Sequence, residues 1–138
     1  FAFGRPAPEV TAAHETVWRA TEAGFSAAVP GATSEDVFNA MNAVLVEGGA
    51  LVKAGGNDVG RMGHGLGMQL TEWPSHKPGD HTVLAPGMLL TREPGMEFAP
   101  GKVMVHEENI VIREGGAEYL TRRASRSIPI VGADAYGA

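Results

Sequence analysis

Three side chains with the donor chemistry of a divalent-metal site lie in the second half of the sequence. They are His64 in GHGLG, Glu93 in TREPG and Glu107 in VHEENIVI. Each occurs at or near a segment typical of a β-strand, and neighbouring antiparallel strands would bring all three together. Imidazole and carboxylate ligands together suit manganese, zinc, iron or cobalt, and an oxygen-rich set favours manganese among these metals.

Each of these residues also has an ordinary structural interpretation. A histidine between glycines is commonly a turn residue or a buried, hydrogen-bonded imidazole. A glutamate before a proline, as at Glu93, is commonly an exposed charge at a strand end. Glu107 and Glu108 together are consistent with one inward and one outward side chain of an exposed strand. The metal hypothesis therefore depends on the three residues in combination.

Other catalytic motifs are absent from the sequence. GHGLG is not a phosphate-binding loop, because no G-x-x-x-x-G-K-[ST] pattern is present. There is no G-x-S-x-G nucleophile motif, and HEENI lacks the second histidine of H-E-x-x-H. We expect the remaining histidines to lie on the surface or behind the ligands, and three arginines to form a solvated basic patch. These residues are His14, His76, His81 and His106, and Arg122, Arg123 and Arg126.

The composition is that of an ordinary globular protein and bounds the possible partners. The 138 residues suit one domain or part of one, and 43% of them are hydrophobic and 20% charged. A net charge of −5 argues against nucleic acid or an anionic membrane as a partner. The chain contains no cysteine, which excludes disulfides and thiolate zinc sites, and no apolar run approaches a membrane span. We expect a cytoplasmic protein.

The hydrophobic pattern predicts two helices, within about residues 7–53, followed by a sheet over about 60–124. Pro8 suits the first turn of the first helix. Thr33 and Asp36 resemble a capping box for the second helix, which Gly48-Gly49 would end or kink. The later segments are short apolar runs separated by Pro-Gly and Gly-Gly turns. The predicted class is therefore α+β, with helices on one face of a mostly antiparallel sheet and a tail that is loose at its end.

The order GHGLG, APGMLLTREPG, HEENIVIREGGAEYLT resembles the creatinase/aminopeptidase P/prolidase group of pita-bread metallopeptidases. FAFGRPAPEVTAAHETV also looks like the stretch that follows the second metal-binding aspartate of that family. The resemblance covers nearly the whole chain. It implies that residues 1–138 form the C-terminal part, about half, of a pita-bread catalytic domain.

The same resemblance implies roles for individual residues. His64, Glu93 and Glu107 match metal ligands of the family, with Glu107 bridging two metals and Glu93 also acting as a catalytic proton shuttle. The glycines beside His64 would let the strand approach the metal and the substrate closely. We expect Thr71, Trp73 and His76, which follow the ligand strand, to line or border the substrate cleft.

The sequence also departs from the family pattern. Two aspartates that complete the family's site are not in this chain, so a single metal, or none, is expected in it as given. Thr71 stands seven residues after His64, where peptidases of the family usually carry a second histidine. Val105 stands two residues before Glu107, where they often carry arginine. These differences put the peptide specificity in doubt more than the scaffold.

Three functions remain open from the sequence. The first is hydrolysis of amide or peptide C–N bonds in the manner of an Xaa-Pro aminopeptidase or dipeptidase. The second is hydrolysis of a small amide, as in creatinase or ectoine hydrolase, and the third is a non-catalytic pita-bread module that binds proteins. The expected partners are a small peptide or amide substrate, together with a second copy in a homodimer or the missing N-terminal half.

Overall fold

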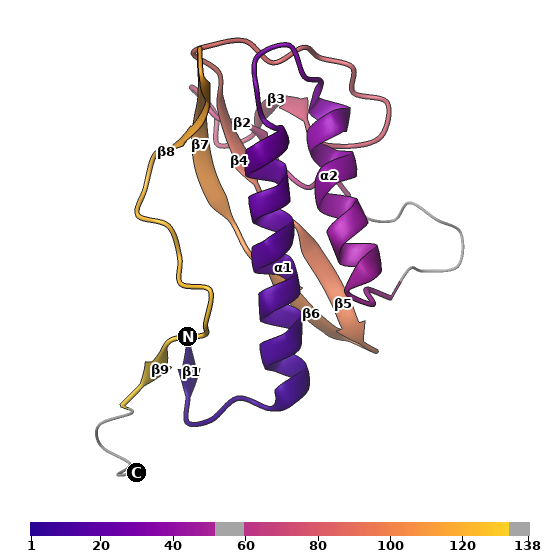
Figure 1. Cartoon of the computed structure of the whole chain (residues 1–138), viewed down its shortest axis with the longest axis vertical. Coiled ribbons are helices and arrows are strands. Elements are labelled where there is room, and N and C mark those ends of the chain that lie inside the picture. Colours follow the sequence, from indigo (N-terminus) through magenta and orange to yellow (C-terminus); the bar gives the residue numbers. More distant parts are fainter. Residues whose placement is uncertain (52–59, 133–138) are drawn as a thin grey trace.

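A computed structural model describes residues 1–51 and 60–132 of the chain. Two helices come first after a short strand, and seven strands and a terminal strand follow (Figure 1). The elements are β1 (Ala2–Phe3), α1 (Pro8–Ala27), α2 (Ser34–Glu47), β2 (His64–Gly65), β3 (Glu72–Ser75), β4 (Leu89–Arg92), β5 (Gly95–Ala99), β6 (Lys102–Val105), β7 (Glu108–Arg113), β8 (Gly116–Tyr119) and β9 (Ile130–Val131).

Helix α1 begins where the sequence predicts. Pro8 occupies the first turn, where the missing N–H costs no helical hydrogen bond, and Glu9 lies at the positive end of the helix dipole. The buried face follows helical spacing. It consists of Ala13, Thr16, Val17, Ala20, Thr21 and Gly24.

Helix α2 is closed at its N-terminus by the predicted capping box. The Asp36 backbone N–H donates to Thr33 Oγ1 at 3.1 Å, and the Thr33 N–H donates to Asp36 Oδ2 at 2.8 Å. The helix ends at Glu47, and Gly48 is its C-cap. Val37, Met41 and Leu45 are buried, and α2 packs along α1.

The central sheet has the strand order β3-β2-β4-β7-β8, and β5 and β6 form a separate pair. Their registers show that β4 and β5 together form one strand, and β6 and β7 the other strand, of one long antiparallel ribbon. Arg92 pairs with Glu108 in the upper half, and Gly95 pairs with Val105 in the lower half without a change of register. The predicted interruption in KVMVHEENIVIRE is thus a break between β6 and β7 within one continuous ribbon.

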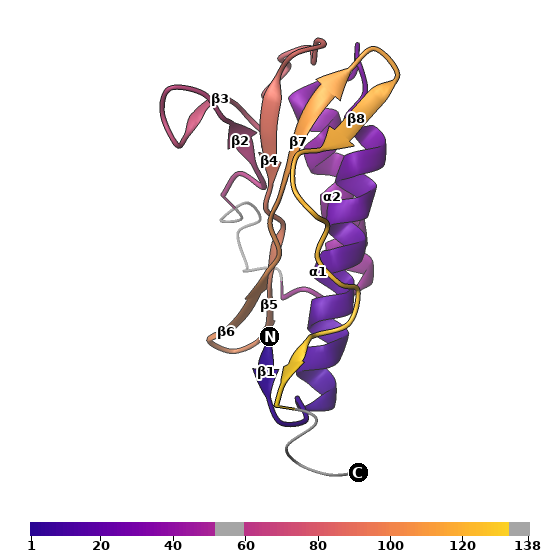
Figure 2. The same ribbon diagram turned by 90° about the vertical axis from the view of Figure 1, so that its left-hand side faces the viewer.

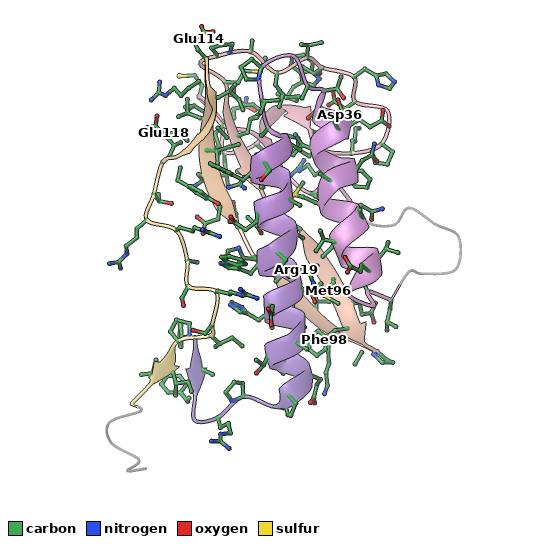
Figure 3. All side chains as sticks on the ribbon, viewed as in Figure 1. Arg19, Asp36, Met96, Phe98, Glu114 and Glu118 are labelled. Carbon is green, nitrogen blue, oxygen red and sulfur yellow. The ribbon has the colours of Figure 1, made fainter. Side chains whose placement is uncertain are left out.

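Both helices cover the same face of the sheet (Figure 2). Leu90, Ile110 and Ile112 of the central strands are fully buried in the core. Met96 and Phe98 of β5 lie beside the lower part of α1 (Figure 3), and Met96 is almost fully buried. The predicted α+β arrangement of two helices on a mostly antiparallel sheet is therefore confirmed.

Two segments near the C-terminus make contacts with distant parts of the chain. The end of the tail, which was predicted to be loose, lies outside the described residues, and before it Ile130 and Val131 form β9, which pairs in parallel with β1. The arginines of the preceding segment are exposed, as predicted, and two of them form ion pairs: Arg123 pairs with Glu22 at 2.6 Å and Arg126 pairs with Glu15. Both guanidinium groups also stack over the indole of Trp18. These partners are distant in sequence, so local sequence patterns do not reveal them.

Neither described helix is long and apolar enough to cross a lipid bilayer.

Candidate metal centre

The ribbon register places Glu93 opposite Glu107. Arg92 pairs with Glu108 on one side of this position, and the His106 N–H donates to the Pro94 carbonyl on the other. The pairing between them is therefore Glu93 with Glu107. Directly opposed residues have Cα atoms about 4.5–5.5 Å apart, and two like charges there destabilise a sheet. A cation between the carboxylates would remove that repulsion.

Strand alternation places both carboxylates on the face away from the helices. Arg92 donates to the Thr21 carbonyl of α1, and His106 lies within hydrogen-bond distance of the Thr21 hydroxyl. Both side chains therefore point toward α1. Because successive residues of a strand alternate between faces, the adjacent Glu93 and Glu107 belong to the opposite face.

His64 lies on this same face with its ring oriented by its own backbone. The β2–β4 register pairs Gly65 with Leu90, which places His64 opposite Thr91, and Thr91 Oγ1 accepts the His64 N–H at 3.0 Å. The ring nitrogen Nδ1 is 2.9 Å from the Gly65 carbonyl, which only accepts, so Nδ1 carries the proton. The lone pair of neutral His64 is then on Nε2, which is 3.7 Å from Glu93 Oε1. A histidine ligand held through its other nitrogen is the usual arrangement at metals.

The structure brings the side chains of His64 and Glu93 together, and it places Glu107 opposite Glu93 in the ladder. Within residues 1–51 and 60–132, no three His, Asp or Glu side chains are close enough together to hold a metal ion. Glu107 is exposed, whereas Glu108 is buried toward α1. A cation is already near Glu93, because Arg61 Nε is 3.8 Å from its Oε1. The chain therefore presents a His64–Glu93 pair with Glu107 across the ladder.

The packing of the neighbouring strands requires the glycines on either side of His64. A Cβ on Gly63 would lie 2.2 Å from the Thr91 carbonyl oxygen of β4, and Gly63 has a φ of 146°. A Cβ on Gly65 would lie 2.4 Å from the Trp73 carbonyl oxygen of β3. The glycines let β3 and β4 pack closely on either side of the histidine strand.

His76 does not border an open cleft in this structure. It is fully buried, and its Nδ1 is 2.7 Å from the Ser34 hydroxyl at the start of α2. Its backbone bonds to Met62 and Gly63 as well. His76 therefore connects the segment that carries His64 to the N-terminus of α2, on the side of the sheet that the helices cover. Its burial lowers its pKa to about 4.

This depressed pKa predicts acid destabilisation in a definite window. The unfolded chain takes up the His76 proton near pH 6.5, whereas the folded chain resists it until about pH 4. The stabilisation is complete above pH 6.5 and falls by up to about 1.4 kcal/mol per pH unit on acidification to pH 4. Urea unfolding from pH 7 to 4 should show a shallower pH slope in His76→Gln, and an unchanged slope in the exposed control His81→Gln. Equal slopes in all three proteins would contradict this role of His76.

The other two predicted substrate residues are accessible. Thr71 is exposed at the end of the loop between β2 and β3, and Trp73 is 70% exposed on β3. The register shifts between the Gly65–Glu72 and His64–Ser75 pairs, so Trp73 and Pro74 form a bulge on β3. A bulge redirects side chains, and here it presents an indole on the hairpin next to His64.

Sequence reasoning missed three residues of this region. The Thr91 hydroxyl accepts a hydrogen bond from the His64 backbone N–H, and Arg61 lies near the Glu93 carboxylate. Arg92 lies on the helix side of the ladder and donates to the Thr21 carbonyl. Arg92 is fully buried beside the stacked rings of Phe25 and Tyr119, with its guanidinium carbon 5.1 Å from each ring centroid, and burial lowers its pKa. Because alternate residues of a strand share one face, the position of Glu93 in the sequence predicts that Thr91, two residues earlier, lies on the same face. The helix contacts of Arg92 leave no comparable sequence signal.

Comparisons with known proteins find similar sequences over most of the chain. The model of Metallopeptidase family M24 matches residues 1–114. A probable dipeptidase PepE of Mycobacterium tuberculosis is 38% identical over 118 residues, covering 85% of this chain and 30% of that protein. The Xaa-Pro dipeptidase of Pyrococcus furiosus is 32% identical over 120 residues, covering 86% and 33%. The chain thus spans about a third of the length of these relatives.

Solved structures show the same similarity in three dimensions. Dipeptidase PepE from Mycobacterium ulcerans superimposes with a TM-score of 0.82 at 30% identity, covering 95% of this chain and 34% of that one. The prolidase from Pyrococcus furiosus gives 0.78 at 30% identity, covering 88% and 35%. These neighbours have the pita-bread fold, so the predicted fold is confirmed.

Proposed function

Because the chain belongs to metallopeptidase family M24, we propose that it supplies part of the active site of a metal-dependent hydrolase of peptide bonds, with Xaa-Pro dipeptides as its substrates. The observation that carries the proposal is the His64–Glu93 pair with Glu107 opposite Glu93 in the ladder. Relatives named Xaa-Pro dipeptidase match the same segment.

The donor set fits a divalent metal. His64 Nε2 and Glu93 Oε1 face each other at 3.7 Å with lone pairs on both atoms, which favours a cation between them. His64, Glu93 and Glu107 would hold the metal, and their nitrogen and oxygen donors favour Mn²⁺ first, with zinc, cobalt or iron as alternatives. Such a metal supplies Lewis-acid polarisation of a carbonyl and water activation near neutral pH.

The remaining steps are assigned to side chains of the chain. Glu93 accepts a proton from the attacking water and passes it to the leaving amine, since its carboxylate lies at the site and is only partly exposed. Thr91 holds the His64 backbone, so that the imidazole keeps its position during the reaction. Exposed Thr71 is available to donate a hydrogen bond to a substrate oxygen.

The activity is tested on the longest natural polypeptide that contains these 138 residues. With Mn²⁺, release of proline from Leu-Pro is expected, measured by chromatography and mass spectrometry. Glu93→Gln should reduce the rate by at least about 100-fold, which is the usual range for a proton-transfer residue. Glu118→Gln, on the distant β7–β8 hairpin (Figure 3), should leave the rate unchanged. Full activity in Glu93→Gln would refute the proposed role, and failure to bind metal would favour the non-catalytic module.

Thr71 motivates the second candidate function, hydrolysis of a small amide of the creatinase or ectoine-hydrolase type. A threonine hydroxyl donates a hydrogen bond but carries no positive charge to stabilise a tetrahedral intermediate. In the same polypeptide, Thr71→His should raise the rate on Leu-Pro, by up to about 100-fold for a gained oxyanion contact. No gain with Mn²⁺ still bound would point to a non-peptide amide.

We also propose that this chain associates with another polypeptide segment or a second copy. Strand β6 pairs only with β5 among the described strands, and Val103 and Val105 on it are 63% and 56% exposed. An unpaired strand with apolar side chains favours pairing with a further strand. Sedimentation of the 138 residues should show a dimer or larger assembly that Val103→Lys weakens. A monomer at high concentration would contradict it.

A further inference from the structure

We propose that Leu66, Trp73 and Leu89 form an apolar subsite that binds one aliphatic side chain of a peptide or amino-acid amide beside the candidate metal centre. The inference rests on the proposed peptidase function for its biological meaning. Its physical basis is separate, because none of the three residues is a proposed metal ligand.

The ladder places this group next to His64. The Leu66 N–H donates to the Leu89 carbonyl at 2.9 Å, so Leu66 stands opposite Leu89. Leu66 lies two residues after His64, and Leu89 lies two residues before Thr91, the residue opposite His64. Both therefore share the face of His64, at a separation of about 6–7 Å along the strands. Consecutive Cα atoms of a peptide are about 3.8 Å apart. A residue adjacent to a bond held at His64 would therefore reach Leu66 and Leu89.

A hollow of about 230 Å³ lies at this position. Its walls are the side chains of Leu66, Trp73, Pro74, Met88 and Leu89, completed by glycines and by Leu90. No charged residue lines it within the described part of the chain. Pockets for whole drug-sized ligands span about 300–1,000 Å³, so this volume suits a single aliphatic side chain. The described residues of the walls carry no charged or amide side chain, which disfavours a charged or amide side chain of the ligand.

The apolar walls remain exposed in the folded chain. Trp73 is 70% exposed and Leu89 is 39% exposed, although both are large enough to be buried in a core. An indole on a strand bulge combines a rigid apolar surface with few rotatable bonds, which lowers the entropy cost of binding. Covering these two side chains with an aliphatic group would remove apolar area from water.

The hairpin that carries Trp73 is held in place before any ligand binds. The Glu72 carboxylate accepts the Gln69 N–H at 2.8 Å across the loop. It fills the space beside Gly67, where a Cβ would lie 2.2 Å from Glu72 Oε2. The Trp73 carbonyl packs against Gly65 in the same way. Trp73 is therefore positioned by close backbone contacts on β2, and the subsite needs little rearrangement.

Trp73 itself reports on the subsite. Trp18 is the only other tryptophan in the sequence, so Trp18→Phe leaves the indole of Trp73 as the sole fluorophore of its kind. The probes are leucinamide, its near-isosteric polar analogue asparaginamide, and alaninamide. Titration in a chelator prevents turnover and separates side-chain binding from metal binding. We expect a saturable change in Trp73 fluorescence, with a midpoint for leucinamide at least about tenfold lower than for either other amide.

A matched pair of variants localises the response. Leu89→Asn should abolish the preference for leucinamide, whereas Leu120→Asn, the same change at an exposed leucine just after β8, should preserve it. Equal midpoints for leucinamide and asparaginamide in the Trp18→Phe protein would overturn the proposal without any further variant. A preference that survives in Leu89→Asn would also overturn it.

A further variant of the Trp18→Phe protein distinguishes failure of the subsite proposal from failure of the proposed peptidase function. His64→Gln should lose metal binding and keep the leucinamide response. Metal binding without any side-chain preference would leave the peptidase proposal standing and remove the subsite. A side-chain preference without metal binding would support the subsite and contradict the peptidase proposal.

Discussion

Replacing Glu93 by glutamine is expected to lower the Mn²⁺ affinity of this chain by more than about 100-fold. Glutamine keeps the shape of the side chain but removes the charge that faces His64 Nε2 at 3.7 Å. Loss of residues that merely support metal ligands costs about 10–100-fold in affinity, so loss of a charged ligand should exceed that range. Titration of the 138-residue chain with Mn²⁺, followed by calorimetry or electron paramagnetic resonance, measures the change.

The matched variants make this expectation specific. His64→Gln and Glu107→Gln should weaken binding as well, because all three residues are proposed donors. Glu118→Gln removes the same charge from an exposed carboxylate that pairs with Arg113 at the β7–β8 hairpin, and should leave the affinity unchanged. Equal affinities for the Glu93→Gln and Glu118→Gln proteins would show that the Mn²⁺ site lies elsewhere, or that binding is nonspecific.

Gly63→Ala is expected to destabilise the fold by about 4 kcal/mol. The added Cβ would meet the Thr91 carbonyl oxygen at 2.2 Å and the His76 ring at 2.6 Å, neither of which has room to move in a paired strand and a buried pocket. The φ of 146° adds backbone strain for any residue with a side chain. Overpacking and a glycine-only conformation each cost roughly 1–3 kcal/mol. Urea denaturation followed by circular dichroism gives the difference.

Gly60→Ala is the control for the same region. Gly60 precedes the histidine strand by a few residues, and a Cβ there would meet no atom within 4 Å. This change should alter the free energy of unfolding by less than about 1 kcal/mol, which is the usual range for an accommodated glycine replacement. If Gly63→Ala were as mild as Gly60→Ala, close packing of β2 on β4 would not be the reason for the glycine.

Local sequence patterns specified the helices well. Pro8 marks the first turn of α1, and Thr33 with Asp36 forms the capping box of α2, because these signals act through backbone groups within one helical turn. The Pro-Gly and Gly-Gly turns separated the strands correctly for the same reason. The order of three motifs also identified the family, which the family model and the solved relatives confirm.

The candidate site was predictable only in part. The sequence selected His64, Glu93 and Glu107 as donors, and they stay proposed ligands. Only the ladder shows that Glu93 lies opposite Glu107, since cross-strand register depends on pairing between segments far apart in the chain. The sequence also grouped His76 with Thr71 and Trp73 as residues of a cleft. The structure buries His76 against Ser34 of α2, a contact that no local pattern encodes.

By itself, then, the sequence determined the chemical types of the donors, the α+β class and the positions of the helices, because these follow from residue identity and spacing within a few residues. The tertiary structure alone decided why His64 is flanked by glycines, which side of the sheet each carboxylate takes, and where the C-terminal segment lies. The glycines are required by carbonyls of Thr91 and Trp73 on neighbouring strands. The C-terminal segment is fixed by Glu15, Trp18 and Glu22 on α1. Such contacts form between residues that only folding brings together, and their geometry depends on the whole packed chain.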